Sequence, residues 1–125
     1  MNEKLKVLCV EPGLPPAEKT ISGGLESLQH EVDGYIECVY PFDDDVCIIC
    51  NEEGKINGLP LNRSLRDEKG EIYDVIAGTF IIAGLTEDSF CSLDGGMIEK
   101  YGELFRYPEI FVSVNGKIRS FPVKD

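Results

Sequence analysis

The strongest strand signal in the chain spans residues 72–83, and it constrains the fold more than any other feature. The run reads Ile-Tyr-Asp-Val-Ile-Ala-Gly-Thr-Phe-Ile-Ile-Ala and is rich in β-branched and aromatic residues, which favour strands. Apolar residues fall on both faces of an extended backbone, as is typical of a strand in the middle of a sheet. We therefore predict a central strand over 72–83. Gly78 in its middle predicts a bulge or the close approach of another group.

Shorter strand-like runs surround this one and are separated by turn residues. They cover 6–10, 19–21, 35–40, 46–50, 110–114 and 117–121. The acidic turn at 42–45 predicts that 35–40 and 46–50 form an antiparallel hairpin. Asn115-Gly116 between the last two runs is the clearest short hairpin signal. The polar segment 62–71 is predicted as a loop or one helical turn.

Two segments have helical spacing. Leu28 and Val32 predict a short amphipathic helix over 24–32, with Gly34 in the left-handed cap position. A second apolar stripe predicts a helix over 94–105 with Asp94 as its N-cap. The predicted class is α+β: a small mixed, largely antiparallel sheet with two short helices and a C-terminal β-hairpin.

Length and charge limit the domain organisation and the class of partner. A chain of 125 residues forms one domain, with a core at about 5–105 and the hairpin at 108–123 as an addition. The net charge of −11, from 12 basic and 23 acidic residues, argues against direct nucleic-acid binding, which depends on Lys and Arg contacts to phosphates. No apolar run approaches the roughly 20 residues of a membrane span. The first residues lack the features of a signal peptide, so we expect a cytoplasmic protein.

The cysteine, histidine and aspartate residues do not make up a complete catalytic or metal-binding motif. Five cysteines in strand-like runs are typical of buried thiols in a reducing compartment. Cys47 and Cys50 lie three apart on a strand, which sends their side chains to opposite faces. His30 is the only histidine, and we expect it at the surface. The triplet 43–45 lacks the EF-hand pattern. We predict no catalytic residue, metal site or cofactor.

A ligand site is the more specific hypothesis. Turns around 50–63 carry amides and Arg63, whose guanidinium suits phosphate or carboxylate. Nearby tyrosines would add stacking surfaces, and Gly78 would allow close backbone approach. The predicted ligand-binding residues are Arg63, Asn62, Asn51, Tyr35, Tyr40, Thr79 and Gly78. A polar loop with structural side-chain caps is the alternative.

The acidic composition supports a different hypothesis, which is mimicry of DNA. Carboxylates at 43–45, 52–53, 67–68 and 87–88 would then stand in for phosphates and bind a basic host protein. That function requires long rows that match the phosphate spacing of roughly 3.4 Å per strand.

Several motifs occur in an order that resembles a known family. In one-letter code they are EPG at 11–13, GGLESLQ at 23–29, GYIE at 34–37, YPFDD at 40–44, CNEEGK at 50–55, LP at 59–60, NR at 62–63 and YDVIAGTF at 73–80. Over residues 5–105 the chain resembles an uncharacterised family, domain of unknown function 3846. Its members occur in phages, prophages and conjugative elements, mostly of Gram-positive bacteria, and the family brings no catalytic residues to carry over.

The resemblance implies a genomic setting rather than a chemistry. We expect a small, acidic, non-enzymatic accessory protein of a phage or mobile element that counteracts host defence by binding a small anionic, nucleotide-like ligand. The alternatives are an acidic protein-interaction module or DNA mimic that binds a host protein, and an uncharacterised enzyme. An exposed sheet edge or the last hairpin permits a homodimer.

Overall fold

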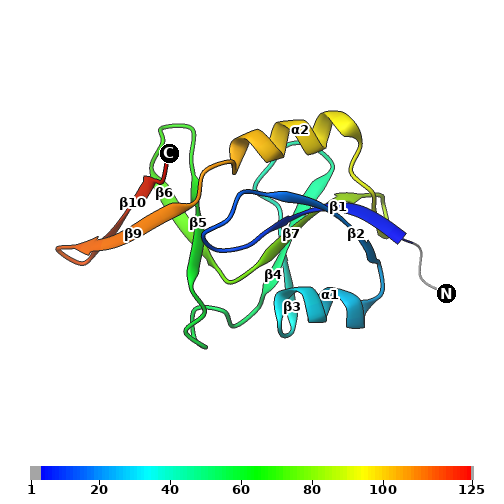
Figure 1. The fold of residues 1–125 in the computed structure, drawn as a ribbon, viewed down its shortest axis with the longest axis horizontal. Helices are drawn as coiled ribbons and strands as arrows, with labels where there is room; N and C mark the ends of the chain where they lie inside the picture. Colours follow the sequence, from blue (N-terminus) through cyan, green and yellow to red (C-terminus); the bar gives the residue numbers. More distant parts are fainter. Residues whose placement is uncertain (1–3, 125) are drawn as a thin grey trace.

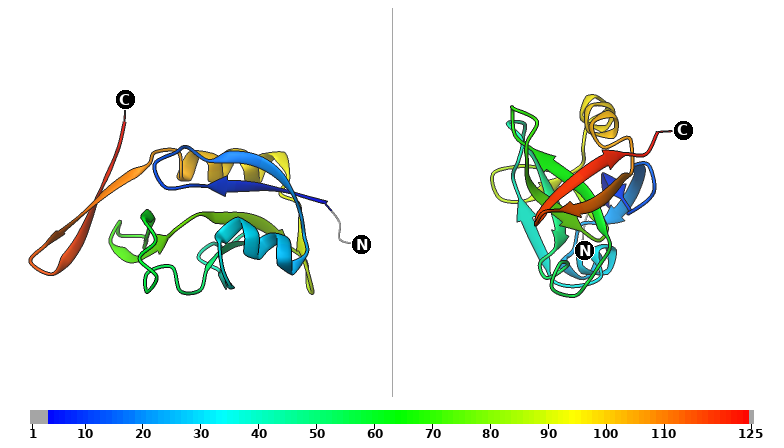
Figure 2. Two further views of the ribbon diagram at one scale, coloured as in Figure 1. Left: turned by 60° about the horizontal axis from the view of Figure 1, so that its bottom comes forward. Right: turned by 90° about the vertical axis from the view of Figure 1, so that its left-hand side faces the viewer.

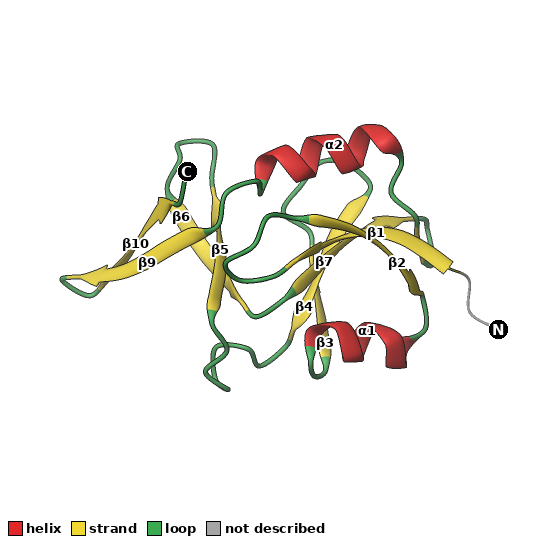
Figure 3. Ribbon diagram, viewed as in Figure 1, coloured by secondary structure: helices red, strands yellow, loops and turns green. Residues whose placement is uncertain are grey.

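The computed structural model describes residues 4–124, so residues 1–3, on which the signal-peptide prediction partly rests, and Asp125 lie outside the described part. Two helices and ten strands alternate along the chain (Figure 1, Figure 3). In order they are β1 (Lys4–Val10), β2 (Ala17–Ser22), α1 (Leu25–Val32), β3 (Ile36–Val39), β4 (Val46–Asn51), β5 (Leu61–Arg66), β6 (Ile72–Ala77), β7 (Phe80–Leu85), β8 (Phe90–Cys91), α2 (Gly95–Leu104), β9 (Glu109–Val114) and β10 (Lys117–Pro122). The α+β class and the C-terminal hairpin are confirmed.

The main sheet has the strand order β2-β1-β7-β4-β3, and the short β8 pairs with β7. Every pairing within residues 4–124 is antiparallel. Ile82 of β7 lies opposite Leu8 on one side and Ile48 on the other. β7 is therefore the central strand, as predicted for this part of the chain. The predicted hairpin of β3 and β4 is also confirmed.

Each face of this sheet has its own covering layer. α1 packs on one face, where Leu28 and Val32 join buried residues such as Cys47, Ile49 and Ile81. The opposite face is covered by α2 and by the ribbon of β5 and β6, so that Tyr101 and Phe105 pack with Phe80 and Ile82. The two helices lie on opposite sides of the sheet in Figure 1. This arrangement explains why β4 and β7 are apolar on both faces: each side of the sheet is a core.

The predicted strand over 72–83 is wrong in one respect, because it is two strands. β6 and β7 are separated by Gly78 and Thr79 and belong to different sheets. Gly78 has φ +83°, and a Cβ at this position would lie 2.7 Å from Leu59 Cδ1. The chain therefore turns at Gly78, and the group that approaches it is the Leu59 side chain.

The prediction for 62–71 is also wrong, because residues 61–66 form β5, which pairs with β6. Its polar residues Asn62, Arg63 and Ser64 are buried, so hydrophobic patterning could not reveal the strand.

The predicted helices are confirmed, with one change at the end of α1. Asp33, rather than Gly34, takes the left-handed conformation, with φ 60°. Gly34 is needed for space, since a Cβ there would lie 2.6 Å from Asn51 Nδ2. The Asp94 carboxylate caps α2 and accepts from Met97 N at 2.8 Å, as predicted. Neither helix in residues 4–124 is long and apolar enough to cross a membrane.

The C-terminal hairpin stands away from the main sheet. β9 and β10 pair only with each other, and they project from one end of the molecule, opposite the N-terminal end (Figure 2). Asn115 and Gly116 both have positive φ, 53° and 80°, which is the type I′ turn expected for Asn-Gly.

Candidate functional site

Arg63 is fully buried, and its guanidinium contacts protein groups. Nε donates to Phe105 O at 3.1 Å, and one terminal nitrogen donates to Leu14 O at 2.6 Å. The other terminal nitrogen donates to Asn62 O at 3.3 Å and Asn62 Oδ1 at 2.8 Å. Burial lowers the pKa of Arg63, and the charge of Glu109 opposes that shift. Arg63 thus joins β5 to the loop after β1 and to the end of α2, which is a structural role.

The two predicted asparagines also bind backbone groups. Asn62 Nδ2 donates to Val10 O at 2.8 Å and to Gly78 O at 2.9 Å. Asn51 Nδ2 donates to Val32 O at 3.1 Å and Asp33 O at 3.0 Å, and its Oδ1 accepts from Glu53 N at 2.8 Å. Both amides satisfy buried carbonyl groups, which would otherwise destabilise the fold. This matches the alternative of structural side-chain caps.

The other predicted site residues do not converge. Tyr35 and Tyr40 are exposed and flank opposite ends of β3. Thr79 is half-buried in the link between β6 and β7. The structure brings Asn62, Arg63 and Gly78 together through hydrogen bonds within the protein. It does not gather all seven residues into one pocket, so the ligand assignment on these residues stays a prediction.

A large concave surface lies elsewhere, between β6 and β10. This groove has a volume of about 970 Å³. Tyr73 and Phe121 contribute aromatic rings that are more than half exposed. The charged side chains that line the groove are Lys55, Arg66, Lys117, Arg119, Glu71 and Asp74. We refer to this surface as the β6–β10 groove.

The charge of this groove is opposite in sign to that of the chain as a whole. Four of the 12 basic residues line it, compared with two of the 23 acidic residues. Lys55 forms an ion pair with Asp74 at 2.6 Å. In the part of the chain that the structure describes, no acidic group lies within ion-pair distance of Arg66, Lys117 or Arg119. The groove is therefore the cationic site of an anionic protein.

Hydrogen bonds hold the hairpin side of the groove in place. Arg66 donates to Gly70 O at 2.8 Å and to Ser120 O at 3.4 Å. Glu109 accepts from Ser64 N at 3.2 Å and Ser64 Oγ at 2.5 Å, and also from Ser120 Oγ. These contacts fix β10 relative to β5, so that Arg119 and Lys117 keep their positions at the groove.

A smaller cavity of about 380 Å³ adjoins the groove and shares Arg66 and Tyr73 with it. Most of its lining is apolar or aromatic, with Phe42, Phe105 and Tyr107 among the residues. The groove and this cavity together offer a cationic part and an aromatic part on one continuous surface. Sequence reasoning missed both, because their residues come from β5, β6, α2 and the last hairpin; the only signal was the cluster of basic residues at 117–119.

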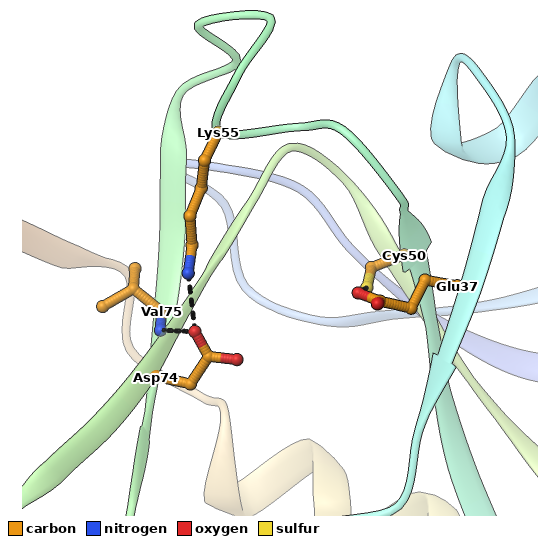
Figure 4. A network of polar contacts seen from close by, with 5 residues as sticks. All are labelled: Glu37, Cys50, Lys55, Asp74 and Val75. Carbon is orange, nitrogen blue, oxygen red and sulfur yellow. Dashed lines mark hydrogen bonds and ion pairs between the residues drawn. The ribbon is translucent and has the colours of Figure 1, made fainter.

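A third cleft, of about 210 Å³, lies between β4 and β6 (Figure 4). The Asp74 carboxylate accepts from Lys55 Nζ at 2.6 Å and from Val75 N at 2.8 Å. On the other side, the Cys50 thiol lies 4.0 Å from Glu37 Oε1. Burial raises the pKa of Cys50 to about 12, with the charge of Glu37 as a smaller cause. The thiol is therefore protonated at neutral pH and is a poor nucleophile.

The remaining sequence candidates have structural or surface positions. Cys47 and Cys50 belong to different cores on opposite faces of the sheet, as predicted, and His30 is exposed, as predicted. Asp44 accepts from Lys100 Nζ at 2.7 Å and from the Tyr101 hydroxyl at 2.5 Å. Both bonds lower the pKa of Asp44. The described residues contain no group of three or more His, Cys, Asp and Glu side chains that could hold a metal ion.

The acidic clusters lie in separate turns of the chain. The triplet 43–45 precedes β4 and the pair 52–53 follows it, so the two lie at opposite ends of that strand. The pair 67–68 lies in the turn between β5 and β6. A long row of phosphate-like charges would require these clusters on one edge.

The chain belongs to the family described as a domain of unknown function (DUF3846), whose model matches residues 5–106. No curated protein and no solved structure matches the chain. The family match ends just before β9, so the last hairpin lies outside it. The β6–β10 groove thus lies between family residues and the hairpin that follows them.

Proposed function

We propose that this member of the family is a non-enzymatic binding protein whose β6–β10 groove takes an anionic ligand of the nucleotide type. One observation carries the proposal. In a chain of net charge −11, Arg66, Lys117 and Arg119 line one groove and have no acidic partner among the described residues. An anion that entered the groove would provide the missing counter-charge.

The form of the groove favours a ligand with an aromatic ring and phosphates. Guanidinium groups bind phosphate oxygens through two parallel hydrogen bonds, and Arg66 and Arg119 both line the groove. Tyr73 and Phe121 offer exposed ring faces on which a base can stack. The groove volume of about 970 Å³ lies at the upper end of the range for small-molecule sites.

The biological setting of this proposal comes from the family resemblance. Members occur in phages and other mobile elements, and we propose that the protein counteracts host defence by sequestering a nucleotide-derived signal in the bacterial cytoplasm. The free cysteines at five positions are compatible with that reducing compartment. The residues that we assign to binding are Arg66, Lys117, Arg119, Tyr73 and Phe121.

Thermal unfolding against a panel of nucleotides, cyclic nucleotides and nucleotide-derived signals tests the proposal. A ligand that binds only the folded protein stabilises it by about 2.7 kcal/mol at a hundredfold excess over Kd, which raises Tm by several degrees. We expect such a shift with one compound, and we expect the double variant Lys117→Glu/Arg119→Glu to abolish it.

The matched control is Lys4→Glu/Lys6→Glu. It makes the same change in net charge on β1, toward the other end of the molecule (Figure 1). This control should keep the ligand-induced shift. If no nucleotide raises Tm, or if both double variants lose the shift equally, the assignment to this groove is wrong.

A further inference from the structure

The two outer edges of the C-terminal hairpin differ in a way that identifies a second binding surface. Because β9 and β10 pair only with each other among the described strands, each has one edge that is not hydrogen-bonded to another strand, although β5 packs against β9 and Ser64 of β5 bonds to the Glu109 side chain at its start. Isolated two-stranded hairpins are marginally stable in water. An exposed edge also presents unpaired N–H and C=O groups that can pair with another chain.

The register identifies the outward-pointing groups. Val114 and Lys117 close the two-residue turn and exchange hydrogen bonds with each other. Since hydrogen-bonded pairs alternate along an antiparallel ladder, Val112 also bonds to β10, whereas the N–H and C=O groups of Phe111 and Ser113 point away from it. On β10 the same alternation points the backbone groups of Ile118, Ser120 and Pro122 outward.

The outer edge of β10 is protected. Ser120 O accepts from the Arg66 guanidinium at 3.4 Å, and Pro122 has no N–H to donate. Proline and basic side chains are common devices that prevent further strand pairing.

The outer edge of β9 has none of these devices. Residues 110–114 read Ile-Phe-Val-Ser-Val, with no charge and no proline. No hydrogen-bond acceptor within the described residues is assigned to the amide of Phe111 or Ser113. On the outward face of the same strand, Ile110, Val112 and Val114 are 56%, 40% and 43% exposed. This is the one edge of the hairpin that can accept another strand.

The charges on the hairpin select the partner. Residues 108–124 contain Lys117, Arg119 and Lys124 but only one acidic residue, Glu109. That carboxylate already accepts from Ser64 and Ser120. Lys117 and Arg119 lie opposite Val114 and Val112 and so share their outward face. Two copies of this hairpin would bring like charges together, whereas an acidic segment would neutralise them.

We propose that the outer edge of β9 accepts an extended, acidic segment of another protein as a third strand. Main-chain hydrogen bonds to Phe111 and Ser113 hold the segment. The carboxylates at every second residue of the bound segment lie on the same face as Val112 and Val114. The segment lies two strand spacings, roughly 9–10 Å, from β10. The long side chains of Lys117 and Arg119 extend over Val114 and Val112 to reach these carboxylates. Exposed charges more than about 10 Å apart are largely screened at 0.1 M salt. The local charge of the projecting hairpin therefore decides the partner. This inference does not depend on a nucleotide ligand.

Amide hydrogen exchange on the intact chain tests the proposal, with a ten-residue peptide of alternating valine and glutamate as the probe. In the free protein, the amides of Phe111 and Ser113 should exchange fast and that of Val112 slowly. The peptide should slow exchange at Phe111 and Ser113 at least tenfold. A peptide with lysine in place of glutamate should bind at least tenfold more weakly. Unchanged exchange, or equal affinity for both peptides, would overturn the proposal.

Two substitutions separate this edge from the groove. Ser113→Pro removes an outward N–H without removing a bond to β10 and should weaken peptide binding at least tenfold, whereas Ser113→Ala should not. If Ser113→Pro unfolds the hairpin, as fast exchange at Val112 would reveal, Val112→Glu provides the test, because it repels an acidic segment without changing the edge amides. Ser113 does not line the groove, so nucleotide shifts should persist in Ser113→Pro and Ser113→Ala.

Measuring the oligomeric state tests the competing possibility that a second copy of this chain occupies the outer edge of β9. Light scattering should show a monomer at concentrations where the peptide binds. If Phe111 and Ser113 instead become protected as the concentration of the protein alone rises, a second copy occupies the edge, and the proposed acidic partner is wrong.

Discussion

The central sheet and the C-terminal hairpin use similar β-rich sequences in opposite ways. In β7, Phe80, Ile81 and Ile82 are 0% exposed, because strands lie on both sides and covering layers on both faces. In the hairpin, Ile110 and Phe121 are 56% and 53% exposed. Both regions have strand-forming residues, so the difference comes from what surrounds them. The sheet buries its apolar residues in two cores, whereas the hairpin leaves apolar and cationic side chains exposed to solvent.

The largest expected effect is a loss of unfolding free energy on substitution of Arg63, which connects β5 to the loop after β1 and to the end of α2. Arg63→Ala would remove the guanidinium that binds Leu14 O, Phe105 O and Asn62. The buried carbonyls would lose their donors, and we expect a loss of about 3–5 kcal/mol in the free energy of unfolding. Urea denaturation measures it, and the exposed Arg66→Ala provides the control, with about 1 kcal/mol or less.

Arg63→Ala also decides between the two roles of this residue. If this variant unfolds at the wild-type urea concentration but no longer binds a nucleotide that stabilises the wild type, Arg63 is a ligand contact, as its sequence context predicted.

Alanine substitutions at Gly78, beside β7, and at Gly116, in the hairpin, allow the stabilities of the two regions to be compared directly. Gly78 and Gly116 have φ +83° and +80°, but only at Gly78 would a Cβ meet another atom, Leu59 Cδ1 at 2.7 Å. Alanine in the left-handed region costs about 1–2 kcal/mol. We therefore expect Gly78→Ala to cost about 2–3 kcal/mol, since Leu59 must move as well. Gly116→Ala should cost about 1 kcal/mol and affect only the hairpin. Equal losses of global stability would show that the hairpin and the sheet unfold together.

A smaller effect is expected on the local stability of the C-terminal hairpin where Glu109 attaches it to β5. Glu109→Ala would remove the carboxylate that accepts from Ser64 N and from the Ser64 and Ser120 hydroxyls. Exchange of the Val112 and Arg119 amides should become about tenfold faster, which corresponds to about 1.4 kcal/mol, while the amides of β7 stay protected. Glu103→Ala, near the end of α2, should change neither. Faster exchange throughout β7 would contradict the independence of the two regions.

The smallest expected effect is a pH dependence at Asp44, on the side of the main sheet. Bonds from Lys100 and Tyr101 lower its pKa below the ordinary value of 3.8. This group therefore stabilises the fold fully above that value, and its contribution is lost as the pH falls through the lower folded pKa. The Tm difference between the wild type and Asp44→Asn should shrink between pH 5 and pH 2.5.

Sequence patterns predicted those parts of the fold in which the signal is local. The Asn115-Gly116 turn, the Asp94 cap and the opposite faces of Cys47 and Cys50 all depend on neighbours in the chain, and all are confirmed. The burial of Arg63 depends on carbonyls at Leu14 and Phe105, 49 and 42 residues away. No local pattern could indicate it.

The β6–β10 groove could not be predicted from the sequence for the same reason. It is built from the outer face of β6 and from a hairpin that begins more than 30 residues later. The sequence identified Arg63 as the basic residue for a ligand, whereas the structure leaves Arg66 and Arg119 free of acidic partners among the described residues. Arg63 belongs to the continuous buried run of β5, whereas Arg66, at the end of the strand, is exposed.

The position of β7 has a consequence for the ribosome-bound chain. β1 and β4 each need β7 as a neighbour, and β1 must wait about 70 residues for it, since Val10 pairs with Phe80. At 5–20 residues per second, that wait lasts roughly 4–14 s. During this time the growing chain exposes two apolar strand edges and the thiols of Cys9 and Cys47. A chain whose translation stalls before residue 80 would therefore keep these strand edges unpaired, and unpaired edges promote aggregation.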